Sequence, residues 1–402
     1  MGHKILKWWL PFWFFTIILW GGCTGRGGLS INSSQSPLSR IDVTYIGGNK
    51  LPVHHLVEIE NLISLGNSEN VVIGSILDVI KWDDRIYISD PATHQIHVFE
   101  EGGEFLFDFG QTGRGPGEFL NISGIRLQPD HQRLLLFSSE AQKLIYYDRD
   151  GKHLSEHKLS FYAEDVVWMG LDKLLFYTEY NTSDASGHFD LLFTDAKGKI
   201  EDRRFPYPKE RRAPGFAYAG YLLPLHDGAI YSGPYKDTLW GIYPDRNEIL
   251  ALFDFGSGRL PNEEFEQISL DNVDMLKYTT ISWQTANDVV WSGLIFQNRA
   301  GHIFFLNIET NRFISGKDLQ QGSILPFINR PVISTGFKNL CTSFTLSDIA
   351  LQEESNSDYL FDLQEAYPIF KPLLDSIDQD ANPILLFYKI NQDSLAKYGY
   401  LP

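Results

Sequence analysis

The chain has 402 residues, of which 43% are apolar, 14% aromatic and 21% charged, and this composition excludes disordered, collagen-like and low-complexity chains. Its 51 Asp and Glu against 34 Lys and Arg give a formal charge of -17. A surface of this charge repels a polyphosphate, so nucleic acid is excluded as a partner. The length is ample for a packed core.

The N-terminus has the pattern of an export signal. Lys4 and Lys7 precede an uncharged apolar run at 8–20, which is followed by small residues and Cys23. The run is shorter than the roughly 20 residues that a helix needs to cross a bilayer. The pattern resembles a bacterial lipobox, which implies removal of residues 1–22 and a lipid on Cys23. The alternative is ordinary secretion with an unmodified cysteine.

The segment after Cys23 is rich in Gly, Ser and Asn up to residue 40, which is typical of a flexible linker. We therefore predict a lipid-anchored tether at 23–40 and a single folded domain at 41–402. The only other cysteine is Cys341, which has no intramolecular partner if Cys23 carries lipid. The domain is thus expected to be stabilised by its core rather than by a disulfide.

An internal repeat indicates the fold. Alternating apolar segments are interrupted by short turns centred on Gly103, Gly151, Gly198, Asn247 and Asn311. The first four turns are 48, 47 and 49 residues apart, which is the usual length of a propeller blade. Gly, Asn and Asp supply the positive φ of a tight hairpin, and Tyr, Phe, Ile and Val alternate with polar residues on either side. Each unit is therefore predicted to be a blade.

A second repeat gives the number of blades. FDFGQTGRGPGEF at 107–119 is echoed by FDFGSGRLPNEEF at 253–265, an offset of about three units. One more hairpin region at 324–351 and a last apolar strand at 382–390 complete the count. We predict an all-β fold, a six-bladed β-propeller of four-stranded antiparallel blades.

Two features complete the architectural prediction. Short helical insertions are expected near 262–278 and 359–378, where apolar residues recur at helical spacing. A strand from within 41–65 is expected to complete the blade that ends with 382–390, because closure removes exposed sheet edges.

These segments resemble the exported six-bladed β-propeller lipoproteins of Gram-negative bacteria, which are relatives of NHL-repeat propellers. The resemblance rests on GQTGRGPGEF at 110–119, IRLQPDHQRLLLF at 125–137, KLIYYDRDGKHL at 143–154 and NPILLFYKI at 382–390. It implies a lipid anchor, a propeller and no established biochemical activity. It assigns no catalytic residue.

The GRGPGEF segment is interpreted as the crossover from one blade to the next. Its glycines permit backbone angles closed to other residues, and Arg114 and Glu118 are expected to pair across it. The alternative is a ligand site in which backbone amides hold an anion beside these two side chains.

A search for catalytic motifs finds no HExxH, GxSxG, CxxC or EF-hand pattern, so no catalytic residue and no metal ligand is predicted. Asp90 lies where NHL-type blades place an aspartate that caps a turn, with cation ligation as the alternative. An enzyme is still open, because propeller lyases and lactonases assemble their sites from single residues on several blades.

The segment 203–221 combines basic and aromatic residues on an otherwise acidic protein, and we interpret it as a long loop. Aromatic faces stack on sugars and Arg binds carboxylates in a fork. A contact for an acidic glycan, peptide or protein is therefore one hypothesis, and a solvated loop is the other. The candidate binding residues are Arg203, Arg204, Tyr207, Arg211, Arg212 and Tyr218. The tryptophans at 82, 168, 240, 283 and 291 are expected between blades rather than at a binding site.

Two functional hypotheses follow. The first is a noncatalytic binding or scaffolding lipoprotein for a glycan, a peptide or an envelope protein. The second is a propeller enzyme, a lyase, lactonase or glycan-active hydrolase, with Ca²⁺ or another divalent cation in the central channel; no other cofactor is expected. Because Thr24 is not the Asp that retains lipoproteins in the inner membrane, we predict the outer membrane, on its periplasmic face in preference to the cell surface.

Overall fold

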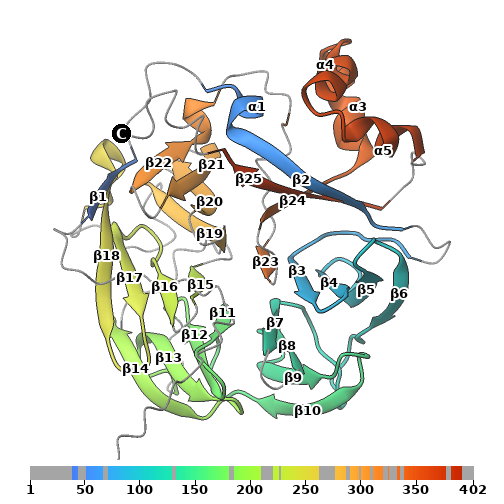
Figure 1. The fold of residues 1–402 in the computed structure, drawn as a ribbon. Helices are drawn as coiled ribbons and strands as arrows, with labels where there is room; N and C mark the ends of the chain where they lie inside the picture. The colour runs from blue at the N-terminus through green and yellow to red at the C-terminus, as the bar shows by residue number, and fades with distance from the viewer. Residues whose placement is uncertain are drawn as a thin grey trace, which may run out of the picture.

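The structure is a computed structural model, and it describes residues 39–43, 51–66, 71–128, 133–180, 185–209, 221–225, 228–261, 277–286, 290–297, 300–307, 311–319, 325, 333–335, 339–376 and 382–391. Within these residues the strands form six small sheets around a ring, which is a six-bladed β-propeller (Figure 1). The predicted fold class is confirmed.

The first five blades follow each other along the chain, and each is an antiparallel sheet in sequence order. Blade 1 contains β3 (Asp78–Trp82), β4 (Arg85–Asp90), β5 (Gln95–Glu100) and β6 (Phe105–Phe109). Blade 2 contains β7 (Gly124–Gln128), β8 (Arg133–Ser138), β9 (Lys143–Tyr147) and β10 (His153–Lys158). Blade 3 contains β11 (Asp165–Trp168), β12 (Lys173–Tyr177), β13 (Phe189–Asp195) and β14 (Ile200–Pro206). Blade 4 contains β15 (Leu222–Pro224), β16 (Ala229–Tyr231), β17 (Thr238–Ile242) and β18 (Asn247–Asp254). Blade 5 contains β19 (Thr280–Ala286), β20 (Val290–Gln297), β21 (Ala300–Asn307) and β22 (Arg312–Ser315).

Blade 6 joins the two ends of the chain. Its central strand β25 (Ile384–Ile390) pairs antiparallel with β24 (Leu340–Phe344) and with β2 (Val57–Ser64). Strand β23 (Ile333–Thr335) precedes β24 in sequence but pairs in parallel with β3 of blade 1. The predicted closure of the last blade by an N-terminal strand is confirmed, and β23 links blade 6 to blade 1.

Blade 4 also gains a strand that the sequence analysis did not expect. Strand β1 (Ser39–Asp42) pairs in parallel with β18 and covers the outer edge of the blade. Ser39 and Arg40, assigned above to the tether, are therefore part of the folded body. The blades at 78–109 and 222–254 each carry a parallel fifth strand, so the purely antiparallel four-stranded description holds for only some of the sheets.

The core is divided among the interfaces between neighbouring blades. Strand β8 shows the arrangement: Leu134 and Leu136 face the core shared with blade 1, whereas Leu135 and Phe137 face the core shared with blade 3. Because successive side chains point to opposite faces, a strand that is buried on both faces is apolar throughout. The tryptophans lie in or against these cores, as predicted: Trp82, Trp168, Trp240, Trp283 and Trp291.

The repeated turns are the outermost hairpins of the blades. Gly103, Gly151 and Gly198 have φ values of 95°, 74° and 81°, and Asn311 has 56°. These left-handed conformations are open to glycine and tolerated by asparagine, which explains why the turns recur with these residues.

Three helices are inserted between β24 and β25, and they gather beyond blade 6 (Figure 1): α3 (Leu346–Ser355), α4 (Tyr359–Ala366) and α5 (Phe370–Ser376). The predicted helical insertion at 359–378 is present, whereas α3 replaces the end of the hairpin expected at 324–351. Thr345 starts α3 with a capping box, since its hydroxyl accepts from the Asp348 N–H and the Asp348 carboxylate accepts from the Thr345 N–H.

A short helix, α1 (Val53–Leu56), precedes β2, and short 3₁₀ turns follow β18 at η2 (Gly256–Gly258) and β22 at η4 (Gly316–Asp318). The helix expected at 262–278 lies outside the described residues except for its last two. Within the described chain, no helix combines the length and apolar character needed to span a membrane.

The strand order places two kinds of connection on the same face of the ring. In an antiparallel blade the fourth strand ends on the side where the second strand ends, so the crossovers between blades lie beside the connections between second and third strands. We call this side the crossover face. It contains 110–123, 159–164, 178–180 and 185–188, and the inserted helices follow β24 on the same side.

Candidate functional site

A buried ion network joins the innermost strands of blades 1, 2 and 3. The Nη1 and Nη2 atoms of Arg126 on β7 each donate at 2.9 Å, to Asp78 Oδ1 on β3 and to Asp165 Oδ1 on β11. Its Nε donates to the Val166 carbonyl at 2.8 Å. Burial raises the pKa of Asp165, while the two carboxylates keep Arg126 charged by raising its pKa. Because the network pairs buried charges across the inner strands of three blades, we assign it to closure of the ring.

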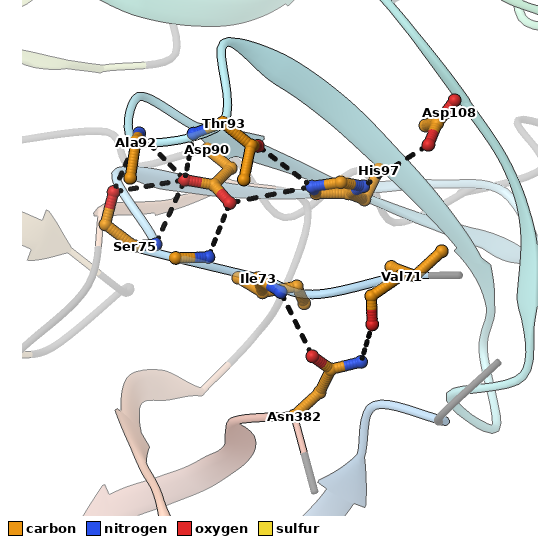
Figure 2. Close-up of polar contacts among 10 residues, drawn as sticks. Val71, Ile73, Ser75, Asp90, Ala92, Thr93, His97, Asp108 and Asn382 are labelled. Carbon is orange, nitrogen blue, oxygen red and sulfur yellow. Dashed lines mark hydrogen bonds and ion pairs between the residues drawn. The ribbon is translucent and has the colours of Figure 1, made fainter. Parts of the chain in front are cut away.

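Asp90 at the end of β4 caps the adjacent backbone, as Figure 2 shows. Its carboxylate accepts from the N–H groups of Gly74, Ser75 and Ala92 at 2.7, 3.0 and 2.9 Å. His97 Nε2 lies 3.6 Å from Asp90 Oδ2. Burial alone raises the pKa of Asp90, but these hydrogen bonds outweigh it and hold the pKa well below its usual range. The capping interpretation is thus confirmed; among the described residues no group of three or more potential metal ligands occurs.

Asn382, in the terminal segment that leads into β25, holds the crossover from blade 6 to blade 1 (Figure 2). Its side-chain oxygen accepts from the Ile73 N–H at 3.0 Å, and its amide donates to the Val71 carbonyl at 3.0 Å. These bonds connect the last strand to a segment more than 300 positions earlier, and they explain how the closing blade is kept in register.

The segment 110–123 is the crossover from β6 to β7, as the sequence indicated, but its two candidate side chains do not pair. The Glu118 carboxylate accepts from the Gly115 N–H at 2.7 Å, and a Cβ at Gly113 would collide with it. The Gly117 N–H donates to a carboxylate on β10, and the Gly113 N–H to a carbonyl. The amides considered for an anion are therefore used within the protein, whereas Arg114 is exposed and forms none of the ion pairs found among the described residues.

The two described candidate arginines of this segment lie on a strand, which corrects the prediction of a loop that begins at 203. Arg203 and Arg204 belong to β14, the outer strand of blade 3, because the segment up to Pro206 pairs with β13. Arg203 is exposed, and its guanidinium donates to the Ala185 carbonyl at 3.1 Å.

Arg204 serves as a link between blades. Its guanidinium donates to Asp202 at 2.9 Å and to the Tyr243 and Pro244 carbonyls and Asn247 Oδ1 at 2.7, 2.6 and 2.7 Å. It also lies 4.2 Å from the centroid of the Phe193 ring. These contacts use the donors that a ligand would need, so the ligand-binding hypothesis for Arg204 has no support in this geometry.

Tyr207 turns into a cluster of buried tyrosines at the crossover face of blades 3 and 4. We call Tyr177, Tyr180, Tyr207, Tyr221 and Tyr231 the tyrosine cluster. The ring centroids of Tyr177 and Tyr221 are 5.1 Å apart, and so are those of Tyr180 and Tyr207.

Asp190 interacts with several members of the tyrosine cluster. Tyr231 donates to Asp190 Oδ2 at 3.0 Å. Burial raises the pKa of Tyr177 and of Tyr207, and the negative charge of Asp190 raises both further. Tyr177 and Tyr207 are therefore neutral over the physiological range, and a neutral tyrosine hydroxyl can donate as well as accept a hydrogen bond.

Beside the tyrosine cluster lies a pair of glutamates. Glu179 follows β12 and is 7% exposed, and Glu164 lies in the crossover that leads into β11. The Tyr162 hydroxyl donates to Glu164. Burial, with the charge and hydrogen bonding of Glu164, raises the pKa of Glu179 to about 8. At neutral pH Glu179 is therefore mostly protonated.

Sequence reasoning missed both the glutamate pair and the tyrosine cluster. The only local signal was the run FYTEY at 176–180, which places an acid between two tyrosines at the end of a strand. Glu179 and Tyr180 adopt φ values of 49° and 57°, a strained conformation for residues with a side chain. Of the predicted candidates, Arg203, Arg204, Tyr207, Arg114 and Glu118 are described, but the structure brings only Tyr207 into this region.

The remaining candidates lie outside the described residues: Cys23, Arg211, Arg212 and Tyr218. Their predicted roles stay predictions.

Fold and site define a six-bladed β-propeller with a polar, aromatic region on its crossover face. The chain belongs to the family described as "Domain of unknown function (DUF4934)", whose model matches residues 38–389. No curated protein matches the chain.

Two solved structures of low sequence identity share the fold. A Bacteroides fragilis protein, named only as a candidate exported protein, has a TM-score of 0.72 and 18% identity, with 88% of this chain and 100% of that chain covered. A member of the DUF4221 family from Bacteroides vulgatus has a TM-score of 0.53 and 12% identity, with 84% and 99% covered. At these identities the likeness shows the fold alone.

Proposed function

We propose that the protein is an exported, lipid-anchored propeller of the cell envelope that binds a glycan, a peptide or an envelope protein without transforming it. One observation carries the proposal: the crossover face of blades 3 to 5 concentrates buried polar atoms that have no hydrogen-bond partner among the described residues. They include the Tyr177 hydroxyl, Glu179 Oε1, Ser232 Oγ and Thr279 Oγ1. Buried polar groups are almost always hydrogen-bonded in folded proteins, so these atoms are suited to partners supplied by a ligand.

The neighbouring aromatic groups fit the same role. Tyrosine rings offer flat apolar faces to a sugar ring or to a peptide side chain, and their hydroxyls bind the polar edges of the same ligand. Propellers bring loops from several blades to one face, which allows such a site to be assembled from residues far apart in sequence.

A binding test follows from the Tyr177 hydroxyl, which has no hydrogen-bond partner among the described residues. The mature protein, immobilised and exposed to a native envelope extract, should retain a component that the double variant Tyr177→Phe, Ser232→Ala retains at least about tenfold less, a loss of about 1.4 kcal/mol. Glu140→Gln, an exposed change on the same face, is the matched control. Equal recovery by wild type and by the double variant would contradict the assignment of the site.

Export and anchoring are proposed from the N-terminal signal pattern and Cys23, and the candidate exported protein with the same fold is consistent with them. Several acyl chains are what stable anchoring requires. We place the protein in the outer membrane, on the periplasmic face. Cys23→Ala should move it from the membrane fraction to the soluble fraction, and an unchanged distribution would contradict the lipid anchor.

The basic segment is proposed as a second contact, for an acidic part of the ligand. Arg203 is exposed in the described part of this segment. Changing Arg203, Arg211 and Arg212 together to Ser, with Arg204 left in place, should weaken capture of an acidic ligand and reduce its salt dependence. If the variant and wild type had the same affinity at every salt concentration, this segment would be a solvated surface and not a contact for the ligand.

An enzyme is the second candidate, because Glu179 has a raised pKa and lies beside a second carboxyl group, and paired carboxyl groups of this kind serve as general acid and base. A lyase, lactonase or glycan-active hydrolase with a divalent cation is the form we consider. Turnover of an envelope glycan or lactone that Glu179→Gln abolishes, and that a chelator also abolishes, would favour this candidate over binding alone.

A further inference from the structure

The backbone brings the two glutamates together. The register of β11 with β12 places Asp165 opposite Tyr177, so the residue before one strand lies beside the residues after the other. The Glu164 N–H donates to the Tyr177 carbonyl at 2.8 Å and extends this ladder by one bond. Glu164 therefore lies alongside Glu179 as a consequence of the hairpin, on the crossover face.

Within the described residues, the groups that interact with the pair are acidic or neutral. Glu164 acts on Glu179, and both glutamates raise the pKa of Tyr162, which lies with Glu164 in the crossover that leads into β11. No Lys, Arg or His is among the contacts of either glutamate within the described residues. Arg126, the cation on the neighbouring inner strand, is already paired with Asp78 and Asp165.

The two glutamates differ in burial. Glu179 is more than nine-tenths buried, and its Oε1 atom has no hydrogen-bond partner within the described part of the chain. Glu164 and Tyr162 are half-buried, so Glu164 is the carboxyl group of the pair that solvent reaches. A ligand group therefore meets Glu164 beside the Tyr162 hydroxyl that donates to it, with the buried Glu179 next to it.

The chemistry of this arrangement selects the ligand. An anion is repelled by Glu164, and a neutral sugar leaves the repulsion between the two carboxyl groups unchanged. A cation relieves it. A primary ammonium group has three donors on a compact charge, which suits two carboxylates and the face of a tyrosine ring.

Resting on the binding function proposed above, we propose that Glu164, Glu179 and Tyr162 form a site for a primary ammonium group of the ligand, as carried by a lysine side chain, an amino sugar or a polyamine. The ammonium displaces the proton that the pair holds, and this proton leaves to the buffer. With a pKa of about 8, Glu179 is roughly 90% protonated at pH 7, so binding there releases close to one proton.

Calorimetry on the mature wild-type protein tests this directly. The probe is N-acetyl-lysine amide, and the matched probe is the same compound with its side-chain amine acetylated. Titration at pH 7 in phosphate and in Tris, whose protonation enthalpies differ widely, gives the number of protons exchanged. We expect binding of the amine alone, with about one proton released, and loss of this release at pH 9.

Variants assign the effect to the pair. Glu164→Gln should weaken binding of the amine by about tenfold or more. Glu179→Gln should abolish proton release while part of the affinity for the amine remains. Glu140→Gln, an exposed acid on the β8 to β9 turn of the same face, removes the same charge and should change neither quantity. The wild-type measurement alone decides the proposal if a variant fails to fold.

The failures are distinguishable. Binding of both probes with equal affinity, binding of the amine without proton release, or no binding of the amine would each overturn the ammonium site. If the amine fails while Tyr177→Phe, Ser232→Ala still loses an envelope component, the binding function stands without this site. If the amine does not bind and the double variant recovers the same envelope components as wild type, the proposed binding function fails as well.

Discussion

Replacement of Arg126 by Met is the sharpest test of how the ring is held together. The side chains have similar length, and Met fills the space of the arginine stem without its charge. The variant leaves Asp78 and Asp165, which are 1% and 6% exposed, facing each other without a cation. It also removes the bond from Arg126 Nε to the Val166 carbonyl.

The expected cost follows from the burial of both partners. Removal of one member of a buried ion pair typically costs about 3 to 5 kcal/mol, because an uncompensated charge is left behind. A body of about 350 residues has an unfolding entropy of about 0.7 kcal/mol per kelvin. A loss of about 4 kcal/mol therefore lowers the melting temperature by about 5 to 6 °C.

The loss should depend on pH with a definite sign. In the variant, burial and mutual repulsion raise the pKa of the two aspartates, so the folded state binds more protons than the unfolded state above pH 4. Stability of the variant then falls as pH rises, and its deficit against wild type is larger at pH 8 than at pH 4.

Thermal and urea unfolding at the two pH values measure this deficit, with the triple variant Asp78→Asn, Arg126→Met, Asp165→Asn as control. Because the triple variant removes the uncompensated charges, it should recover most of the loss. An Arg126→Met variant that melts within 1 °C of wild type at both pH values would show that the network does not hold blades 1 to 3 together.

Three further outcomes are expected. Truncation after residue 380 removes β25, the centre of blade 6, and should lower the melting temperature of the whole body in one cooperative transition; a full-length melting temperature would contradict closure. Arg204→Ser should lower the free energy of unfolding in urea by about 2 to 4 kcal/mol, because four carbonyl or side-chain acceptors lose their donor. Arg203→Ser should change this free energy by no more than about 0.5 kcal/mol. Equal effects of the two variants would contradict the link between blades. Because the pKa of Glu179 is raised from 4.5 to about 8, the wild-type protein should lose stability as the pH rises from 4.5 to 8. Glu179→Gln should be more stable than wild type at pH 9 but not at pH 4. Parallel curves of stability against pH for the two proteins would refute the raised pKa.

The fold was predictable because its signals are local. Gly103, Gly151 and Gly198 sit at left-handed turn positions that few other residues tolerate, so their spacing reports the blade repeat directly. Strands buried on both faces read as apolar runs, and a last blade short of one strand called for an N-terminal partner. Strand β1 carried no such signal, because it is only four residues long and adds in parallel to an outer edge.

The candidate site was less predictable because it depends on contacts between distant elements. The basic residues near 203 suggested a loop. They lie on β14, an outer strand, and an outer strand has one exposed face that carries polar residues. The donors of Arg204 are used by a hairpin of the next blade, about 40 positions away, which composition does not reveal. The proximity of Glu164 to Glu179 is implied by the β11 to β12 hairpin, but the burial of Glu179 is not.

Several features that destabilise the folded state occur together in the connection after β12, and they indicate that this connection has a function. Glu179 and Tyr180 are held at left-handed φ, Glu179 Oε1 and the Tyr177 hydroxyl have no partner among the described residues, and a like charge faces Glu179. Each of these features lowers the stability of the folded state, and folded proteins retain such features chiefly at functional sites. Tyr177→Phe and Glu179→Gln should therefore raise the stability of the ligand-free protein at pH 8 while they weaken binding. If the connection were purely structural, these substitutions would not raise the stability of the protein and weaken ligand binding at the same time.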